Sequence, residues 1–104
     1  MKSNVIFTIV TTNYIPLSNI LGDSIKVKQP NTDYKVFIAD KFEHNSVAAI
    51  SRYDFFPLDV LAISNIESMA FKYNLTEFCT AIKPKCFEFL FTLAYSKIIY
   101  LEQK

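Results

Sequence analysis

The segment Val5-Ile6-Phe7-Thr8-Ile9-Val10 is a continuous run of apolar and β-branched residues that has no polar face. Runs of this kind are typical of strands that are covered on both sides, as strands are in a parallel sheet. A second run of the same character extends from Tyr34 to Ala39, and a third, Ile98 to Leu101, lies near the end of the chain. Helices must cover both faces of such strands, so these runs predict an α/β protein.

The segments between the runs have other signatures. Pro16 suits the first turn of a helix, and one side of that helix is traced by Leu17, Ile20, Leu21, Ser24 and Lys28. After the second strand, we expect a short helix around Ser46 to Arg52, ended before Pro57. A further strand is then predicted from Leu58 to Ile63, followed by a short helix from Ile66 to Tyr73.

A long helix is predicted after Asn74. Asn74 and Glu77 have the spacing of a capping box, in which each side chain bonds the other residue's backbone N–H. The apolar residues that follow repeat with helical spacing: Leu75, Phe78, Cys79, Ile82, Cys86, Phe89, Leu90 and Leu93. Pro84 removes one hydrogen bond of the helix, so we expect a kink after Ile82 that could divide the segment into two helices in series.

These elements predict one domain over residues 1–104, because two domains would each be too small to bury a core. The fold class is α/β, with a Rossmann-like, mostly parallel sheet of about four strands and helices on both faces. In such sheets, ligands bind beyond the carboxyl ends of the strands. Those positions are expected at Thr11 to Tyr14, Asp40 to His44, Ser64-Asn65 and Glu102.

Charge and composition exclude several classes of protein. The formal net charge is +1, which gives no broad field to attract nucleic acid or an anionic membrane. The one glycine, Gly22, excludes the glycine-rich phosphate loops. No apolar run reaches the length of a membrane span or of a signal-peptide core, so we expect a cytoplasmic protein.

The two cysteines are predicted to be apolar packing residues. Cys79 and Cys86 lie about two helical turns apart, roughly 10 Å, which is too far for a disulfide. The one histidine, His44, lies in a loop some thirty-five residues before Cys79, so cysteine catalysis is not expected. Asp40, Glu43 and His44 lie close together in the sequence, but a lone histidine in a polar loop is more simply explained as a solvated side chain than as a metal ligand.

Several strings resemble the amino-terminal, nucleotide-binding half of GT-A glycosyltransferases, particularly the glycogenin-like and lipopolysaccharide-galactosyltransferase-like enzymes. The first strand and Thr12 to Leu17 are similar to the family's opening strand and turn. Thr80-Ala81-Ile82-Lys83-Pro84 matches the family pattern threonine-alanine-x-lysine-proline. Lys97 to Leu101 resembles its lysine-valine-isoleucine-tyrosine-leucine strand, and the resemblance covers nearly the whole chain.

The resemblance implies binding of a nucleotide diphosphate sugar, such as a UDP-sugar, together with Mn²⁺ or Mg²⁺. In the family an aspartate-x-aspartate motif follows the last strand and holds the metal, whereas here Glu102-Gln103-Lys104 follows. Glu102 is therefore only a remnant of a metal site. A metal bound with a diphosphate needs several hard oxygen ligands, so the chain is interpreted as a truncated donor-binding portion that is inactive alone.

The resemblance assigns donor binding to Thr12, Asn13, Tyr14, Asp40 and Lys83, with Lys83 beside the diphosphate and Asp40 beside the base or ribose. Each residue also has a simpler explanation. Thr12 to Tyr14 fit ordinary turn and capping chemistry, Asp40 fits a surface turn, and Lys83 fits a solvated lysine at the proline.

The alternative function is a small, non-enzymatic α/β module that acts through protein contacts. Association is expected under either function, because Ile98 to Leu101 is apolar on both faces and should lie at a sheet edge. Phe87, Phe91 and Ala94 add apolar surface beside it. The sequence therefore predicts a homo-oligomer that buries residues 87 to 101, around a two-fold axis.

Overall fold

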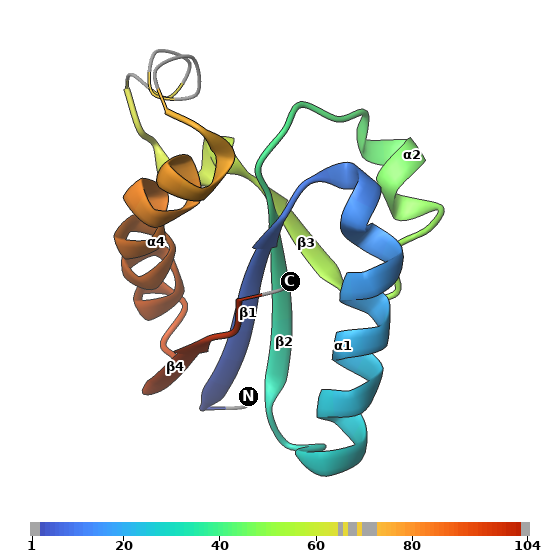
Figure 1. Cartoon of the computed structure of the whole chain (residues 1–104). Coiled ribbons are helices and arrows are strands. Elements are labelled where there is room, and N and C mark those ends of the chain that lie inside the picture. Colours follow the sequence, from blue (N-terminus) through green and yellow to red (C-terminus); the bar gives the residue numbers. More distant parts are fainter. Residues whose placement is uncertain (1–2, 65, 67–68, 70–72, 103–104) are drawn as a thin grey trace.

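The computed structural model describes residues 3–64, 66, 69 and 73–102, and these residues form one parallel sheet with helices on both faces (Figure 1). The strands are β1 (Asn4–Val10), β2 (Asp33–Ile38), β3 (Asp54–Pro57) and β4 (Lys97–Tyr100). Their order across the sheet is β3-β2-β1-β4, and every neighbouring pair is parallel. The predicted α/β class and Rossmann-like arrangement are confirmed.

β1 lies inside the sheet and is the strand that the longest apolar run encodes. It pairs with β2 from Val5 opposite Asp33 to Val10 opposite Ile38. On its other side it pairs with β4, from Asn4 opposite Lys97 to Phe7 opposite Tyr100. All residues from Val5 to Val10 are buried, because a strand in this position has another strand on each side and a helical layer on each face.

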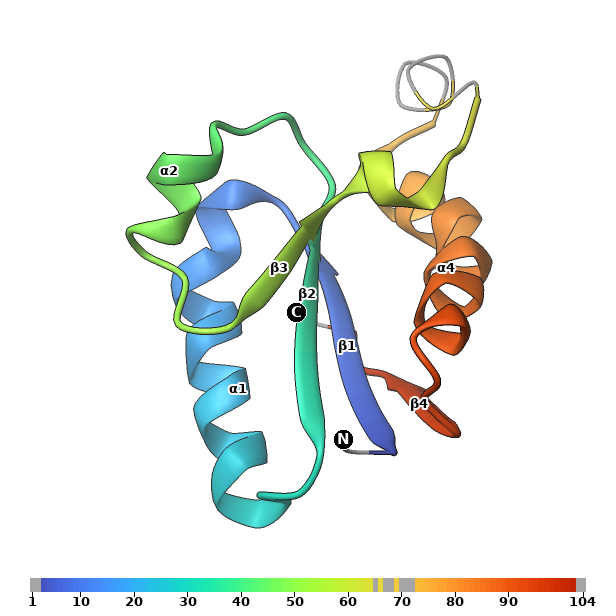
Figure 2. The same ribbon diagram turned by 180° about the vertical axis from the view of Figure 1, so that it is seen from behind.

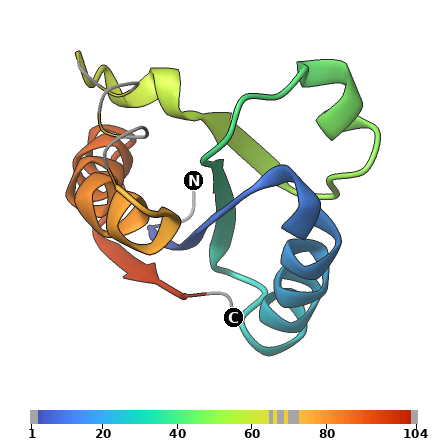
Figure 3. The same ribbon diagram turned by 45° about the horizontal axis from the view of Figure 1, so that its top comes forward.

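Helix α1 (Ile15–Lys28) and the short helix α2 (His44–Ala48) lie on one face of the sheet, and α4 (Leu75–Thr92) lies on the other (Figures 2 and 3). There are also two described 3-10 helices: η1 (Thr12–Tyr14), separated from β1 by Thr11, and η2 (Leu58–Leu61), which follows β3 directly. No helix among the described residues is long and apolar enough to cross a bilayer.

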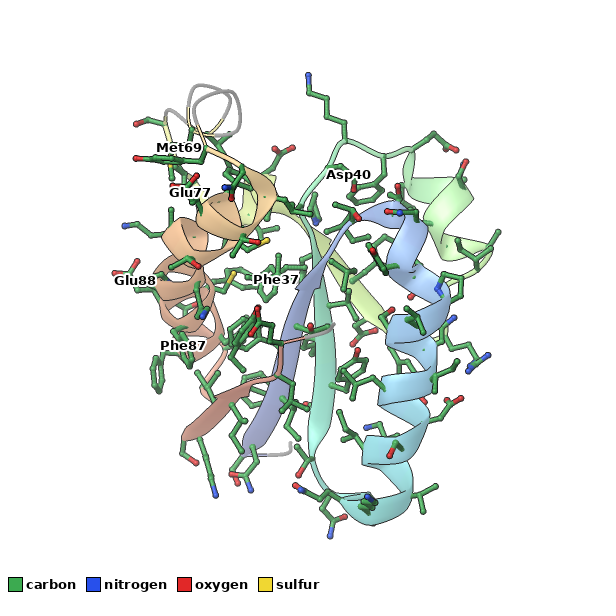
Figure 4. The ribbon with its side chains drawn as sticks, viewed as in Figure 1. Phe37, Asp40, Met69, Glu77, Phe87 and Glu88 are labelled. Carbon is green, nitrogen blue, oxygen red and sulfur yellow. The ribbon has the colours of Figure 1, made fainter. Side chains whose placement is uncertain are left out.

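The core between α4 and the sheet is rich in aromatic rings. Phe7 of β1 and Phe37 of β2 are fully buried, and their rings meet edge to face with centroids 5.6 Å apart. Phe87 of α4 packs against Phe7 at 5.1 Å, and Phe89 packs against Phe37 at 6.1 Å. Figure 4 shows Phe37 in the layer between the sheet and α4.

The buried face of α1 differs from the predicted one. Leu17 and Ile20 are 44% and 62% exposed, and the helix instead buries Ile15, Ser18, Asn19, Gly22 and Ile25. Small and polar residues face the sheet here because large rings already fill the space below the helix. Tyr34 of β2 reaches α1 and donates a hydrogen bond from its hydroxyl to the Ser18 carbonyl, at 3.0 Å.

The predicted strand from Leu58 to Ile63 is wrong. The third strand is β3, which ends at Pro57, and Leu58–Leu61 forms η2. β3 is favoured because its adjacent phenylalanines serve both faces of the sheet: Phe55 packs on the α1 side and Phe56 on the α4 side. The run after Pro57 instead curls toward α4, and Leu61 is buried in that core.

The helix expected around Ser46 to Arg52 begins and ends earlier, as α2. Glu43 sets its start, because the Glu43 carboxylate accepts hydrogen bonds from the backbone N–H groups of Asn45 and Ser46 at 3.1 Å each. A hydrogen bond from the Ser46 hydroxyl, together with these backbone bonds, lowers the pKa of Glu43. The helix expected from Ile66 to Tyr73 falls largely outside the described residues.

α4 begins as predicted, at a capping box. The Glu77 N–H donates to Asn74 Oδ1 at 2.9 Å, and the Asn74 N–H donates to the Glu77 carboxylate at 3.2 Å. The helix then runs through Pro84 without a break, so the expectation of two helices in series is wrong. Proline has no N–H, so Pro84 cannot donate the helical hydrogen bond to the Thr80 carbonyl. Pro84 and Thr80 both lie on the exposed side of the helix, where water can bond this carbonyl instead.

We expect Asn74→Ala to lower the free energy of unfolding by about 1 kcal/mol, because it leaves helix N–H groups without an acceptor. Urea unfolding monitored by circular dichroism measures this loss. Asn74→Asp keeps the acceptor and should retain most of the stability. Thr76→Ala, in the same turn but without a capping bond, should change the free energy by less than about 0.5 kcal/mol. Equal losses for Asn74→Ala and Thr76→Ala would contradict the prediction.

Candidate functional site

The carboxyl ends of the strands meet at one edge of the sheet, which comes toward the viewer in Figure 3 and is called the carboxyl edge below. The chain places β1, β2 and β3 side by side in one direction and then returns to add β4 on the other side of β1. The strand order therefore reverses between β1 and β4. Ligands of parallel α/β sheets bind at such switch points, because loops leave the two strands in opposite directions and open a crevice.

A pocket of about 200 Å³ lies at this reversal, and we call it the switch-point pocket. Its walls come from the ends of β1 and β4 and from the first half of α4. The polar side chains at its surface come from Thr11, Tyr14, Thr76, Thr80, Lys83 and Glu102, and Cys79 and Tyr100 are among its other lining residues. The structure thus brings Tyr14, Lys83 and Glu102, three of the residues proposed from the sequence, to one place.

Lys83 is held at this pocket by an aromatic ring. Its side chain is half-buried, and Nζ lies 4.4 Å from the centre of the Tyr100 ring. The face of an aromatic ring attracts a cation by about 0.5–1 kcal/mol or more. This contact uses no oxygen acceptor, so the ammonium N–H groups can still donate to an anion in the pocket.

Burial sets the protonation of the neighbouring groups. The pKa of Cys79 is raised, first by burial and then by Glu102, while the charge of Lys83 opposes the rise. The pKa of Tyr100 is also raised by burial and, to a smaller extent, by Cys79 and Glu102. Both groups are therefore protonated and neutral at neutral pH. Cys79 packs as a neutral thiol, in keeping with the prediction that the cysteines are not nucleophiles.

Asp40 lies at the end of β2 and binds the loop that follows β1. Its carboxylate oxygens accept hydrogen bonds from the Thr12 N–H at 2.9 Å and from the Thr12 hydroxyl at 2.8 Å. Asn13, which is exposed, accepts a bond from the Thr11 hydroxyl. Figure 4 shows Asp40 beside the start of α1. Asp40 and Thr12 are thus bonded to each other, and these bonds fix the shape of the carboxyl edge.

A second, larger pocket of about 620 Å³ lies beyond the ends of β2 and β3, and we call it the β2–β3 pocket. Its ionisable residues are Asp40, Lys41, His44 and Asp59, and its apolar walls include Phe42, Leu58, Ile66 and Phe78. The two pockets are neighbours: the backbone of Ala39, in this pocket, bonds that of Val10, in the other, at 2.8 Å. Phe78 and Cys79, consecutive in α4, line one pocket each.

The sequence interpretation missed Asp59 and Leu58 as site residues because it placed the third strand too late. It expected that strand to end near Ser64-Asn65, whereas β3 ends at Pro57, so the next two residues lie at the carboxyl edge. The adjacent phenylalanines before Pro57 were the available signal, since they can fill both faces of a buried strand.

The described residues do not fit a protein-held divalent cation. No group of three or more histidine, cysteine, aspartate or glutamate side chains is assembled among them. Glu102 is the one carboxylate among the described residues that line the switch-point pocket, and Glu43 caps α2. Mg²⁺ and Mn²⁺ prefer several oxygen ligands in octahedral geometry, so no step of the chemistry is assigned to a metal.

The chain matches no protein-family model, no curated protein and no solved structure. The structure and the site therefore define its class by physical features alone. It is a small α/β protein with a four-strand, all-parallel sheet of Rossmann-like topology and two neighbouring pockets at the carboxyl edge.

Proposed function

We propose that the chain binds a nucleotide diphosphate sugar at the carboxyl edge, as the donor-binding portion of a glycosyltransferase of the GT-A class. The observation that carries the proposal is the position of Lys83, whose ammonium lies at a pocket at the switch point of the sheet. A diphosphate needs such a cation, and parallel α/β sheets bind their ligands at this point.

The sizes of the pockets suggest how the ligand divides between them. The switch-point pocket, at about 200 Å³, is smaller than the ~300–1,000 Å³ of pockets that hold a drug-sized ligand. It suits a diphosphate rather than a whole nucleotide sugar. The β2–β3 pocket is larger and mostly apolar, and Asp40 lies at its boundary. A base and ribose extending from the diphosphate toward Asp40 and Thr12 would use both pockets.

Charge limits the affinity. Lys83 favours a diphosphate in the switch-point pocket, whereas Glu102 at the same pocket opposes it. The net charge of +1 adds little long-range attraction. Binding should therefore weaken as salt is raised, because it depends on a small number of partly exposed charges.

A titration with UDP and with UDP-glucose, each with and without Mn²⁺, tests the proposal. We expect chemical-shift changes at residues 11–14, 40 and 79–83, with a dissociation constant at or below about 1 mM. Lys83→Met should weaken binding about tenfold or more, since a hydrogen bond to a charged group contributes about 1.5–3 kcal/mol.

Lys85→Met is the matched control, because Lys85 lies on the same helix, is exposed and pairs with Glu88 at 3.3 Å outside the pocket. It should bind UDP as the unmodified chain does. No chemical-shift change at millimolar UDP would contradict the proposal. A large loss of thermal stability in Lys83→Met would show that the contact with Tyr100 is structural instead.

A further inference from the structure

The two edges of the sheet differ in how well they are protected. β3 forms one edge and carries features that discourage pairing with another strand: it ends in Pro57, which has no N–H, and it begins with the charged Asp54, bound by Lys35. β4 forms the other edge, and no strand of the described residues pairs with its outer side. Its sequence, Lys97-Ile98-Ile99-Tyr100, contains neither proline nor an acidic residue.

The hydrogen bonds of β4 show which backbone groups face outward. The N–H groups of Lys97 and Leu101 donate to the carbonyls of Ser3 and Phe7, so these alternate residues point toward β1. Backbone groups of successive residues in a strand point to opposite sides. The N–H and C=O groups of Ile98 and Tyr100 therefore point away from the sheet, at the open edge.

The side chains at this edge are largely apolar. Ile99 is 36% exposed on the face that α1 covers elsewhere, and Phe91, in the last turn of α4 on the other face, is 56% exposed. Lys97 is the one charged residue of β4. An edge that combines outward-facing backbone groups with exposed apolar side chains is suited to pairing with another strand.

We propose that this edge pairs with the same edge of a second copy of the chain, antiparallel and about a two-fold axis at Ile99. In that register Ile99 of one copy lies opposite Ile99 of the other, and Ile98 of each copy lies opposite Tyr100 of the other. The outward groups of Ile98 and Tyr100 then exchange hydrogen bonds, so every backbone group left open on β4 gains a partner. The two sheets become one continuous sheet.

Charge and symmetry favour a second copy over a different protein. The pairing opposes an isoleucine to itself and an isoleucine to a tyrosine, and β-branched and aromatic residues pair well across strands. Lys97 falls opposite Leu101, so the two lysines are separated by about 14 Å along the strands, beyond the screening length of ~8–10 Å at ordinary salt. The net charge of +1 on each copy adds little repulsion.

The area of the interface limits how tightly two copies can bind. β4 is four residues long and spans only about 14 Å, so an interface built on it should be smaller than the ~800 Å² per partner of a standard interface. We therefore expect a dimer that forms in the micromolar to hundred-micromolar range rather than a permanent one.

Sedimentation velocity at several concentrations, with the pair of variants Ile99→Lys and Ile99→Glu, tests both the surface and the register. The unmodified chain should shift from monomer to dimer between about 1 and 200 μM. Each variant alone should stay monomeric, because it opposes like charges at the axis. An equimolar mixture of the two should dimerise again, since lysine then faces glutamate.

Val27→Lys is the control, because Val27 is 83% exposed on α1, away from β4. It should dimerise like the unmodified chain, and circular dichroism should show that all variants are folded. A strictly monomeric unmodified chain at about 200 μM overturns the proposal. Dimerisation that persists in Ile99→Lys also overturns it, and failure of the mixture to reassociate overturns the register. None of these results depends on nucleotide binding.

Discussion

Phe7→Ala is expected to lower the free energy of unfolding by about 3–5 kcal/mol, the range for removing a fully buried phenylalanine. Phe7 has no exposed surface and lies on the strand at the centre of the fold. Its ring meets those of Phe37, Phe87 and Tyr100, with centroids 5.6, 5.1 and 5.1 Å away. Four elements, β1, β2, α4 and β4, therefore lose contacts through one substitution.

Such a loss is a large part of the ~5–15 kcal/mol expected for a domain of this size, so the variant should be partly unfolded at moderate urea concentrations. Phe91→Ala is the control, because that ring is 56% exposed. It should cost less than about 1 kcal/mol when measured at a concentration where the chain is monomeric. Similar losses for the two variants would mean that Phe7 does not occupy the core as described.

Gly22→Leu is expected to lower the free energy of unfolding by about 3 kcal/mol, and Gly22→Ala by about 1–2 kcal/mol, through overpacking. A Cβ atom at Gly22 would lie 2.4 Å from the Tyr53 ring and 2.8 Å from the Tyr34 ring. The rings cannot simply move aside, since the Tyr53 hydroxyl bonds Asp23 and the Tyr34 hydroxyl bonds the Ser18 carbonyl.

The prediction that Gly22→Ala lowers the free energy of unfolding is the most specific part, because the usual effect of alanine in a helix has the opposite sign. In an exposed helix, replacing glycine with alanine stabilises by about 1 kcal/mol. Ser24→Ala, at an exposed position of the same helix, should be neutral or slightly stabilising, because alanine has a higher helix propensity than serine. Thermal and urea unfolding of the three variants measures these effects. A gain in stability for Gly22→Ala would show that α1 does not approach the two tyrosines this closely.

The candidate site was predictable in part. Tyr14, Asp40 and Glu102 follow predicted strands, and for that reason they could be placed at the carboxyl edge from the sequence. The residues around Lys83 indicated that the first half of α4 also contributes to the site. The contacts among these residues were not predictable. Asp40 and Thr12 are far apart in the sequence, and only the parallel pairing of β1 with β2 brings the Asp40 carboxylate to the Thr12 N–H. The donor-binding roles of these residues stay predictions.

The sequence by itself determined the elements whose burial is complete or whose ends are local. A run such as Val5 to Val10 has no polar side to expose, so it must be an interior strand, and the Asn74–Glu77 capping box specifies its own helix start.

Tertiary structure decided which side of α1 is buried and which segment forms the third strand. Both depend on what lies opposite. The rings of Tyr34 and Tyr53 lie against Gly22 and leave no room for a side chain there, and Leu17 and Ile20, on another side of the helix, face outward. Phe55 and Phe56 fill opposite faces of the sheet edge, so the more apolar run after Pro57 is displaced into η2. Hydrophobicity and spacing indicate that a segment is buried, but the volume left by distant side chains determines where it packs.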